Sequence, residues 1–326
     1  MKLASIERVV NIRDIPGADN IQVADIQGYQ VVVKRNEFND GDLCIFHNPD
    51  CIVDKDNPVY SFLKDKRLRI IKLRGQISQG LALPVSSFNL TNVNEGDDVT
   101  EVVKIIKYTK ELPVSLRGIA KGNFPPFLVK TDEENLRSNK AVINELQGSE
   151  IYITQKVDGS SLTAYHKDGV FGVCSRNLDL VEEESNSFWR AARQYKLEEK
   201  LKALGNYALQ AELYGLGLNG NKMQETEIKI AIFNLFDINN SKFCDLSELE
   251  TFANGFELPL VKKVFQGVCG FSLQDLVELA NKQEYKPGVL CEGIVVRPII
   301  ETRSNVLSGR LSVKVISEQY GLKHKE

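Results

Sequence analysis

The sequence predicts an α+β protein in which an all-β module precedes a larger domain of mixed strands and helices. Residues 1–105 contain short Val- and Ile-rich runs separated by turn signals, which is typical of strands. After residue 150 such runs are interleaved with helical patterns, and a Pro-rich break at 124–127 lies between the two parts. With 326 residues, 42% of them apolar and 26% charged, the chain is long enough for two globular domains.

Composition and charge exclude several classes of protein. The 23 glycines and 10 prolines follow no period, which excludes collagen-like and disordered chains. No apolar run approaches the roughly 18–20 residues of a membrane span, and charges interrupt every apolar run of the N-terminus, so we expect neither a membrane segment nor a signal peptide. A net charge of −3 argues against general coating of DNA but permits a local basic groove. A monomer is the default expectation.

The six cysteines and three histidines predict neither a zinc site nor a disulfide framework. No two cysteines form a C-x-x-C pair, and the histidines are scattered. We therefore expect reduced, mostly buried thiols in a cytoplasmic or nuclear protein.

Residues 1–105 are predicted to form a small barrel of OB or similar type. Turn signals such as Pro16-Gly17 and 94–97 separate five or six short strands. The predicted strands include Ile21–Ile26, Tyr29–Val33, Leu43–His47, Arg67–Leu73 and Gly80–Pro84.

A run of cations in this module alternates partly with apolar residues. On a strand, that alternation would place several positive charges on one face. Two interpretations stay open, a solvated edge strand protected by lysines and a strip that faces nucleic-acid phosphates. The candidate nucleic-acid-binding residues are Lys64, Lys66, Arg67 and Arg69.

Residues 106–128 are predicted to link the barrel to a second domain at 129–326. Val102–Tyr108 is predicted to be a strand that leaves the barrel, and Thr131 is predicted to cap a helix that begins with Asp132. The strands predicted in the second domain are Tyr152–Lys156, Ser161–His166, Val170–Cys174, Tyr207–Tyr214, Ile228–Ile238, Gly293–Pro298 and Leu311–Ile316, and the helices are 185–204, 245–255 and 272–283.

Single charged residues interrupt the buried-looking strands of the second domain. Lys156 opens the sequence K-V-D-G at a strand end, a pattern that is ordinary by itself. Glu212, Glu292 and Lys314 each lie in or beside an otherwise apolar strand. A lone buried charge is unfavourable, whereas charges that converge on one polar site are typical of active sites. Lys156 is the candidate nucleophile, because a desolvated strand-end lysine can be held neutral.

Taken in order, these motifs resemble those of the covalent nucleotidyltransferases. The motifs are K-V-D-G at 156–159, S-R-N at 175–177, E-L-Y-G at 212–215, F-D at 236–237, E-G-I-V-V-R at 292–297 and Lys314. This superfamily holds the ATP-dependent DNA and RNA ligases and the mRNA capping enzymes. The E-G-I-V-V-R-P form and the K-T-D-E-E segment look most like RNA ligases, and the front barrel fits the branch with an N-terminal OB domain. The resemblance covers half of the chain and implies an ATP-grasp-like ligase domain of antiparallel sheets flanked by helices.

The resemblance implies a role for each matched residue. Lys156 would attack the α-phosphate of ATP and form lysyl-AMP. Glu212 would hold the ribose hydroxyls, and Arg176 the ribose or a phosphate. Phe236 would stack on adenine, with Phe233 as the fallback.

The same resemblance implies the electrostatic part of the site. Glu292 and Asp158 would bind a divalent metal, Mg²⁺ or Mn²⁺, through water, and the metal charge would lower the pKa of Lys156. An alternative role for Asp158 is to orient Lys156. Lys314 would neutralise the α-phosphate, and Gln155, next to the nucleophile, is counted among the nucleotide-binding residues.

Two positions depart from the family pattern. Many RNA ligases end the series with K-x-K, whereas here Ser312 takes the first position, so a phosphate contact is missing or is supplied by Arg310 or Arg297. Ser161 stands where some RNA ligases have Asn. A looser match assigns triphosphate or RNA contacts to Lys130 and Arg137.

The resemblance predicts an ATP-dependent RNA ligase that joins 3′-hydroxyl and 5′-phosphate ends in RNA repair. The few residues after Lys314 leave no room for the OB domain that DNA ligases and capping enzymes carry there, which favours an RNA ligase. The alternatives are a minimal DNA ligase, a GTP-using guanylyltransferase and a non-enzymatic nucleic-acid-binding protein. The sequence does not distinguish a nicked duplex from free ends.

Overall fold

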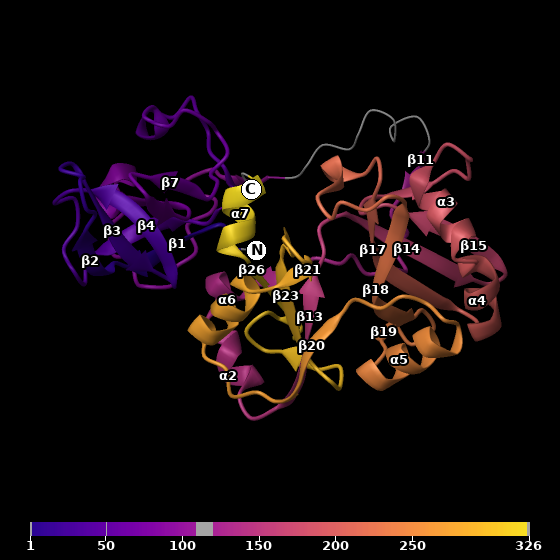
Figure 1. The fold of residues 1–326 in the computed structure, drawn as a ribbon. Coiled ribbons are helices and arrows are strands. Elements are labelled where there is room, and N and C mark those ends of the chain that lie inside the picture. The colour runs from indigo at the N-terminus through magenta and orange to yellow at the C-terminus, as the bar shows by residue number, and fades with distance from the viewer. Residues whose placement is uncertain (1, 50, 109–119, 325–326) are drawn as a thin grey trace. The chain divides into compact units, whose positions relative to one another are not determined.

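The computed structural model describes residues 2–49, 51–108 and 120–324 (Figure 1). It contains two compact units, one of residues 1–111 with 318–326 and one of residues 112–317. The first unit is rich in short strands and the second mixes strands with helices, so the predicted α+β class is confirmed. Among the described residues, no helix has the length and apolar character needed to cross a bilayer.

Short antiparallel strands build the first unit. One sheet has the order β1-β5-β9 and another the order β2-β3-β4, with β6 paired to β10 and β7 to β8. The strands are β1 (Ala4–Arg8), β2 (Val10–Asp14), β3 (Ile21–Ile26), β4 (Tyr29–Lys34), β5 (Leu43–His47), β6 (Cys51–Ile52), β7 (Ile71–Leu73), β8 (Gln76–Ser78), β9 (Leu81–Pro84) and β10 (Ile106–Lys107). The unit also contains η1 (Pro58–Tyr60), η2 (Val85–Phe88) and α7 (Glu318–His324).

Two strand predictions in this unit are wrong. Most of the predicted strand at 67–73 is irregular, and only β7 pairs as a strand. The backbone N–H of Leu68 donates to the Cys51 carbonyl at 2.9 Å, and the buried Leu68 side chain fixes the segment on the core. Within 102–108, a turn precedes the two-residue β10.

The second unit contains two large sheets. The seven-stranded sheet is antiparallel in the order β11-β16-β15-β14-β17-β18-β19, and the five-stranded sheet has the order β12-β26-β23-β13-β20 with one parallel pair, β12 and β26. The seven strands are β11 (Ala120–Asn123), β14 (Ser160–Lys167), β15 (Val170–Cys174), β16 (Leu178–Leu180), β17 (Tyr207–Gly215), β18 (Ile228–Asp237) and β19 (Lys242–Phe243). The five are β12 (Glu134–Asn135), β13 (Glu150–Lys156), β20 (Lys263–Val268), β23 (Gly293–Pro298) and β26 (Val313–Ile316).

Helices and two small hairpins complete this unit. The hairpins are β21 (Glu284–Lys286) with β22 (Val289–Leu290) and β24 (Arg303–Ser304) with β25 (Gly309–Arg310). The helices are η3 (Leu136–Asn139), α2 (Val142–Leu146), α3 (Ser187–Gln194), α4 (Leu197–Leu204), η4 (Asn219–Asn221), α5 (Leu246–Gly255) and α6 (Leu273–Asn281).

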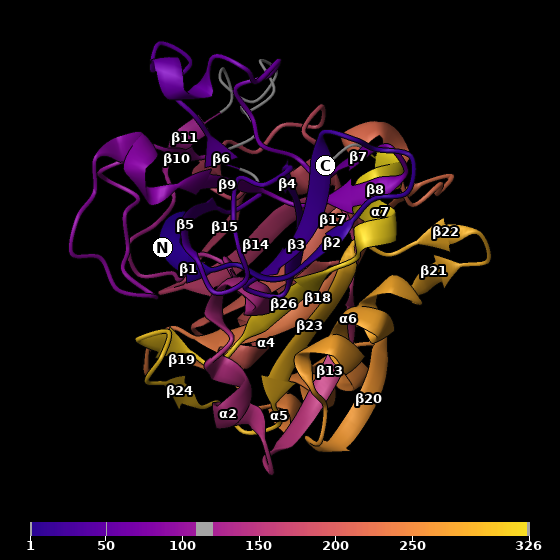
Figure 2. The same ribbon diagram turned by 90° about the vertical axis from the view of Figure 1, so that its left-hand side faces the viewer.

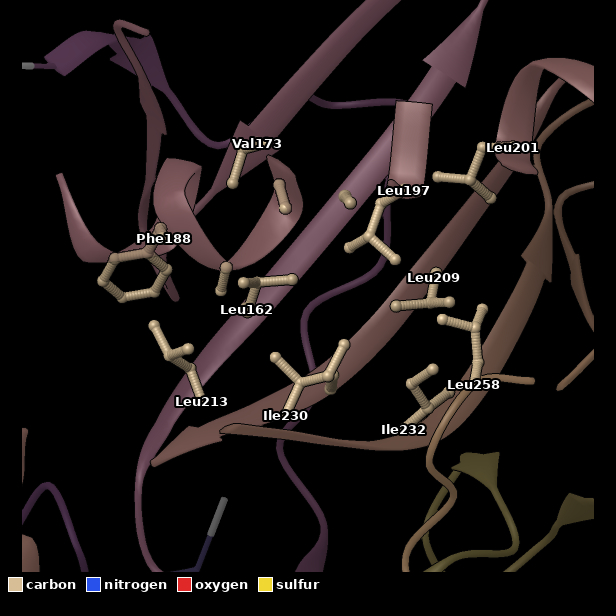
Figure 3. Close-up of a cluster of buried hydrophobic side chains, with 14 of the residues drawn as sticks. Leu162, Val173, Phe188, Leu197, Leu201, Leu209, Leu213, Ile230, Ile232 and Leu258 are labelled. Carbon is tan, nitrogen blue, oxygen red and sulfur yellow. The ribbon is translucent and has the colours of Figure 1, made fainter. Parts of the chain in front are cut away.

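Each sheet buries one face beneath its helices. Leu209, Ala211 and Leu213 of β17 pack into the core under α3, α4 and α5 (Figure 3). Ile151 and Ile153 of β13 pack with the buried residues of α2 and α6, which lie beside the five-stranded sheet in Figure 2. Because side chains alternate between the two faces of a strand, the charged residues on these strands project from the opposite faces.

The structure corrects two helix predictions. The predicted helix at 185–204 is two helices, since Lys196 has a left-handed φ of 53° between α3 and α4. No helix begins at Thr131, because Glu134–Asn135 pairs with β26 and the first helical turn of that segment is η3, capped by Asn135.

Candidate active site

Lys156 ends β13, which lies between β23 and β20 in the five-stranded sheet. The register of β13 with β23 places Lys156 opposite Gly293, and the Glu292 N–H donates to the Lys156 carbonyl at 2.9 Å. The two side chains therefore leave the sheet side by side, and the Lys156 ammonium lies 2.5 Å from a Glu292 carboxylate oxygen. A side chain at position 293 would collide with the Val315 carbonyl, so glycine is required for this close approach of strands.

Two further carboxylates act on Lys156, Glu212 from the other sheet and Asp158 from the turn that follows β13. Glu212 lies on β17 opposite Ser161, and the turn that carries Asp158 passes beside it. A Cβ at Gly159 would collide with the Leu213 carbonyl. Only glycine fits between this turn and β17, so the K-V-D-G and E-L-Y-G motifs are held in contact.

Burial and the neighbouring charges together shift the pKa values of Lys156, Glu212 and Glu292. Burial raises the pKa of Glu212 to about 8, Lys156 opposes this, and Glu292 and Asp158 add to it. Burial likewise raises the pKa of Glu292. Burial lowers the pKa of Lys156, but Glu292, Glu212 and Asp158 raise it more, so that it lies above its ordinary value. In the protein alone, Lys156 is a cation and must lose a proton before it can act as a nucleophile.

Arg297 occupies the neighbourhood of the missing lysine at position 312. Its buried guanidinium donates to Ser312 Oγ at 2.9 Å, to the Phe233 carbonyl at 2.9 Å and to Glu133 at 2.8 Å. Arg310 binds Glu301 and donates to Asn234 at 2.8 Å. Ser312 thus accepts a hydrogen bond from a cation that the adjacent strand supplies.

Glu133 joins this arginine pair to Lys314. Burial raises the pKa of Glu133, but the positive charges of Arg297, Arg310 and Lys314 outweigh it and lower the pKa to about 2. The charge of Lys314 also opposes, in small part, the rise that burial causes in the pKa of Glu292. Lys314 is therefore close enough to influence both the Lys156 cluster and the arginine pair, as a phosphate-binding cation of this site would be.

A pocket of about 240 Å³ lies beside the arginine pair. Its walls come from the 129–134 segment, from β18 and β19, and from residues 307–312. The polar residues in these walls include Lys130, Asp132, Glu133, Asn234, Arg310 and Ser312.

Two predicted nucleotide-binding residues, Phe236 and Gln155, are buried among partners within the protein. Phe236 is only 2% exposed and packs edge-on against Phe243 at a ring distance of 5.0 Å, so it has no free face to stack on a base. Phe233, the fallback, is half-buried beneath the Arg297 guanidinium, 5.9 Å from it. The buried Gln155 side chain donates to the Glu284 carbonyl at 2.9 Å, because neighbouring strand residues face opposite sides.

Arg176 and the residues of the 130–137 segment have partners of their own. Arg176 donates to both carboxylate oxygens of Asp132 at 2.9 Å on the surface. Lys130 donates to Asn177 at 2.9 Å. Arg137 is 2% exposed, so it has no surface on which to bind RNA or triphosphate.

The four candidate nucleic-acid-binding residues lie in the first unit and differ in exposure. Lys64 and Lys66 are exposed, whereas Arg67 and Arg69 are half-buried. Arg67 stacks on Tyr108 at 3.8 Å. The prediction of a single strand with cations on one face is therefore wrong, and the exposed Lys64 and Lys66 lie outside any strand.

Sequence reasoning missed Glu133 and Lys222. The sequence pattern places Glu133 at a helix start, where an acidic residue is expected because negative charge stabilises a helix N-terminus. Lys222 forms an ion pair with Asp158 at 2.5 Å from the segment between β17 and β18. A lysine in a loop gives no signal by itself, and only the Asn-Gly-Asn that precedes it indicates an unusual turn.

Comparisons with known proteins agree on both units. Residues 3–85 match an OB-fold domain, and residues 149–316 match the RNA ligase family. The comparison with curated protein sequences gave no match.

Solved structures of Naegleria gruberi RNA ligase are similar over the whole chain. A lysine-to-methionine mutant with AMP and Mn is 33% identical, with a TM-score of 0.89 and coverage of 100% of this chain and 99% of that one. The ligase with pyrophosphate has the same identity and coverage and a TM-score of 0.88. A glutamate-to-alanine mutant with ATP and Mn is 31% identical, with a TM-score of 0.88 and full coverage of both chains.

Proposed function

The chain belongs to the RNA ligase family, and from this premise we propose that it uses ATP to seal RNA 3′-hydroxyl and 5′-phosphate ends. The observation that carries the proposal is the convergence of Lys156 at the end of β13, Glu292 just before β23 and Glu212 on β17 at one partly buried point. The Naegleria gruberi structures with ATP, AMP and pyrophosphate support it, since these are the substrate and product groups of adenylyl transfer.

The reaction consists of three displacements at phosphorus. Lys156 Nζ, once deprotonated, forms a bond to the α-phosphorus of ATP while the bond to pyrophosphate breaks. An oxygen of the RNA 5′-phosphate then displaces the lysine and takes the AMP. The 3′-hydroxyl finally attacks that 5′-phosphate, and AMP leaves. Each displacement depends on in-line positioning and on neutralised phosphate charge.

The residues around Lys156 divide these duties. In this proposal Glu212 accepts hydrogen bonds from the ribose hydroxyls, and Lys314 binds the α-phosphate. Phe233, half-buried on β18, replaces Phe236 as the residue that stacks on adenine. Arg176 binds ribose or phosphate after release from Asp132.

A divalent cation fits the chemistry of the cluster. Three carboxylates face Lys156, and burial, with their mutual repulsion as a smaller cause, raises the pKa values of Glu212 and Glu292. No group of three or more His, Cys, Asp or Glu side chains suited to a metal is found in residues 2–49, 51–108 and 120–324. Glu292 and Asp158 would therefore hold Mg²⁺ or Mn²⁺ largely through water. When bound, the ion supplies positive charge that stabilises the reacting phosphate and lowers the pKa of Lys156.

We also propose a monomer that works in a reducing compartment, the cytoplasm or the nucleus. None of the six cysteines, all of which lie in the described part of the chain, forms a disulfide, and five of them are buried. Analytical ultracentrifugation and fractionation of cells test these two points, and a dimer or a secreted protein would contradict them.

Labelling with α-³²P ATP tests the proposed function. Wild-type protein with Mn²⁺ or Mg²⁺ should acquire a covalent AMP on Lys156, found by denaturing gel and mass spectrometry and abolished by EDTA or by Lys156→Ala. The matched control is Lys282→Ala, an exposed lysine at the C-terminal end of α6, which should label normally.

The same assay separates the rival activities. Labelling from GTP but not ATP would indicate a guanylyltransferase, and sealing of all-DNA nicks but not RNA would indicate a DNA ligase. Folded wild-type protein that takes no label from any nucleotide would contradict the proposal and leave a nucleic-acid-binding protein.

A further inference from the structure

The segment between β17 and β18, residues 216–227, has a constrained backbone. Asn219, Gly220 and Asn221 have positive φ values of 44°, 70° and 50°, and Gln224 has one of 55°. Successive left-handed residues are rare and persist only where the surroundings hold them. We call this segment the 216–227 loop.

The loop is anchored on its far side. Met223 is completely buried, and Glu225 forms ion pairs with Lys229 at 2.7 Å and Lys286 at 3.1 Å. Asn221 closes the loop on itself, since its side-chain amide donates to the Glu225 carbonyl at 2.8 Å. These contacts give the loop a fixed position relative to both β18 and the β21–β22 hairpin.

The near side of the loop contacts the turn that follows Lys156. The Asn219 side-chain amide donates to the Gly159 carbonyl and lies 3.3 Å from Ser160 Oγ. The Lys222 ammonium lies 2.5 Å from Asp158, and the two side chains are only 16% and 11% exposed. The 216–227 loop thus binds three successive residues, 158–160, in the segment that follows Lys156.

We propose that Lys222, supported by Asn219, is a positioning residue that fixes Asp158 and its turn for attack by Lys156. Glu212 and Glu292 repel the Asp158 carboxylate, and the Lys222 charge offsets that repulsion within a part of the site that is largely shielded from water. Without it, Asp158 is free to compete with Glu292 for the Lys156 ammonium and the turn loses its alignment. This inference rests on the proposed function, because it concerns the adenylylation of Lys156.

The proposal predicts a particular division between binding and chemistry. A residue that acts only through Asp158 alters the rate at saturating ATP, whereas a residue that binds phosphate directly alters the affinity for ATP. Lys222→Met should lower the single-turnover rate of lysyl-AMP formation at least tenfold and leave the Kd for ATP within twofold. Lys222→Arg keeps a cation beside Asp158 and should recover most of the rate.

Two further variants keep the test decisive. Asn219→Ala removes hydrogen bonds but leaves no charge unpaired, and it should slow adenylylation at least threefold. It therefore tests the proposal even if Lys222→Met does not fold. Lys263→Met, which breaks a 2.6 Å ion pair with Glu250 away from the loop, is the matched control and should keep the wild-type rate.

Each outcome has a defined meaning. Folded Lys222→Met or Asn219→Ala protein with the wild-type rate would overturn the proposal, and so would a rate reduction caused wholly by weaker ATP binding. Absence of lysyl-AMP in the wild type would instead reject the proposed function itself.

Discussion

At the scale of single residues, Lys156 is held by the same carboxylates that its chemistry needs. Glu292 and Glu212 keep the ammonium protonated in the protein alone. In the proposed mechanism Lys156 therefore attacks only after it has lost its proton, either because bound positive charge lowers its pKa or because the pH is raised. On that proposal the lysine stays unreactive until the site is filled.

The rate of lysine adenylylation should increase with pH. The pKa of Lys156 lies above its ordinary value, so below it only a small fraction of the residue is neutral, and that fraction grows about tenfold per pH unit. Single-turnover labelling at constant ionic strength between about pH 6 and 9 measures this slope. A rate that is flat across the range would mean that deprotonation of Lys156 does not limit the reaction.

Glu133 should make the protein less stable in acid. Its pKa is lowered from 4.5 to about 2, so its ionised form stabilises the folded state above pH 4.5, and this stabilisation is lost as the pH falls toward 2. The contribution at neutral pH is at most about 3 kcal/mol. Urea unfolding of Glu133→Gln should show a deficit of this order at pH 7 that shrinks by pH 3.

The control for this experiment is Glu150→Gln, at an exposed position where β13 begins. It should change the free energy of unfolding by less than about 0.5 kcal/mol at either pH. If the Glu133→Gln deficit were the same at pH 7 and pH 3, the arginine pair would not be the cause of its stability.

At the scale of elements, strands were predicted more accurately than the segments between them. β3, β5, β15 and β23 have the predicted bounds, because alternating or continuous apolar runs between turn residues determine them locally. The break at Lys196 and the pairing of 134–135 with β26 depend on distant contacts, which no local pattern contains. The orientations of Phe233 and Phe236 also depend on a distant contact. The register between β17 and β18 shifts between Gln210 and Ala211, and this shift decides which face of the sheet each ring lies on.

The basic segment of the OB module should contribute to RNA binding through its exposed lysines. Replacing Lys64, Lys66 and Lys72 by Gln should weaken RNA binding. It should also make binding less sensitive to salt: the slope of the logarithm of the binding constant against the logarithm of salt concentration should become shallower by up to about 0.7–0.9 for each phosphate that is no longer bound. Binding measured at several salt concentrations tests this, with lysine adenylylation as a check on folding. The corresponding change of Lys196, Lys202 and Lys282, exposed on or beside helices of the other unit, is the control.

If the two triple variants bind RNA with equal affinity and equal salt dependence, the basic segment of the OB module is not part of the RNA interface. Arg67 and Arg69 are left unchanged in this design. Both are half-buried, and Arg67 packs on Tyr108, so their replacement would disturb the fold as well as the charge.

At the scale of the whole molecule, the order of the motifs predicted the family, and the match to RNA ligases over the full chain confirms it. The predicted OB module is confirmed as well. The contacts between the two sheets could not be predicted from the sequence. In them Arg297 donates to the Phe233 carbonyl of β18, and Lys222 forms an ion pair with Asp158. Those contacts join residues that are far apart in the chain, so no local pattern in the sequence contains them.

The parallel pairing of β12 with β26 has a consequence for the newly made protein. It places Asn135 beside Lys314, so β12, the first strand of this sheet in the chain, can pair only after β26, the last one, has been made. Contacts of such long sequence separation form late in folding, and a chain still on the ribosome cannot complete the sheet before residue 316 has emerged. Until then Lys156 has no Lys314 nearby, so the unfinished polypeptide lacks the cation that we propose for the α-phosphate.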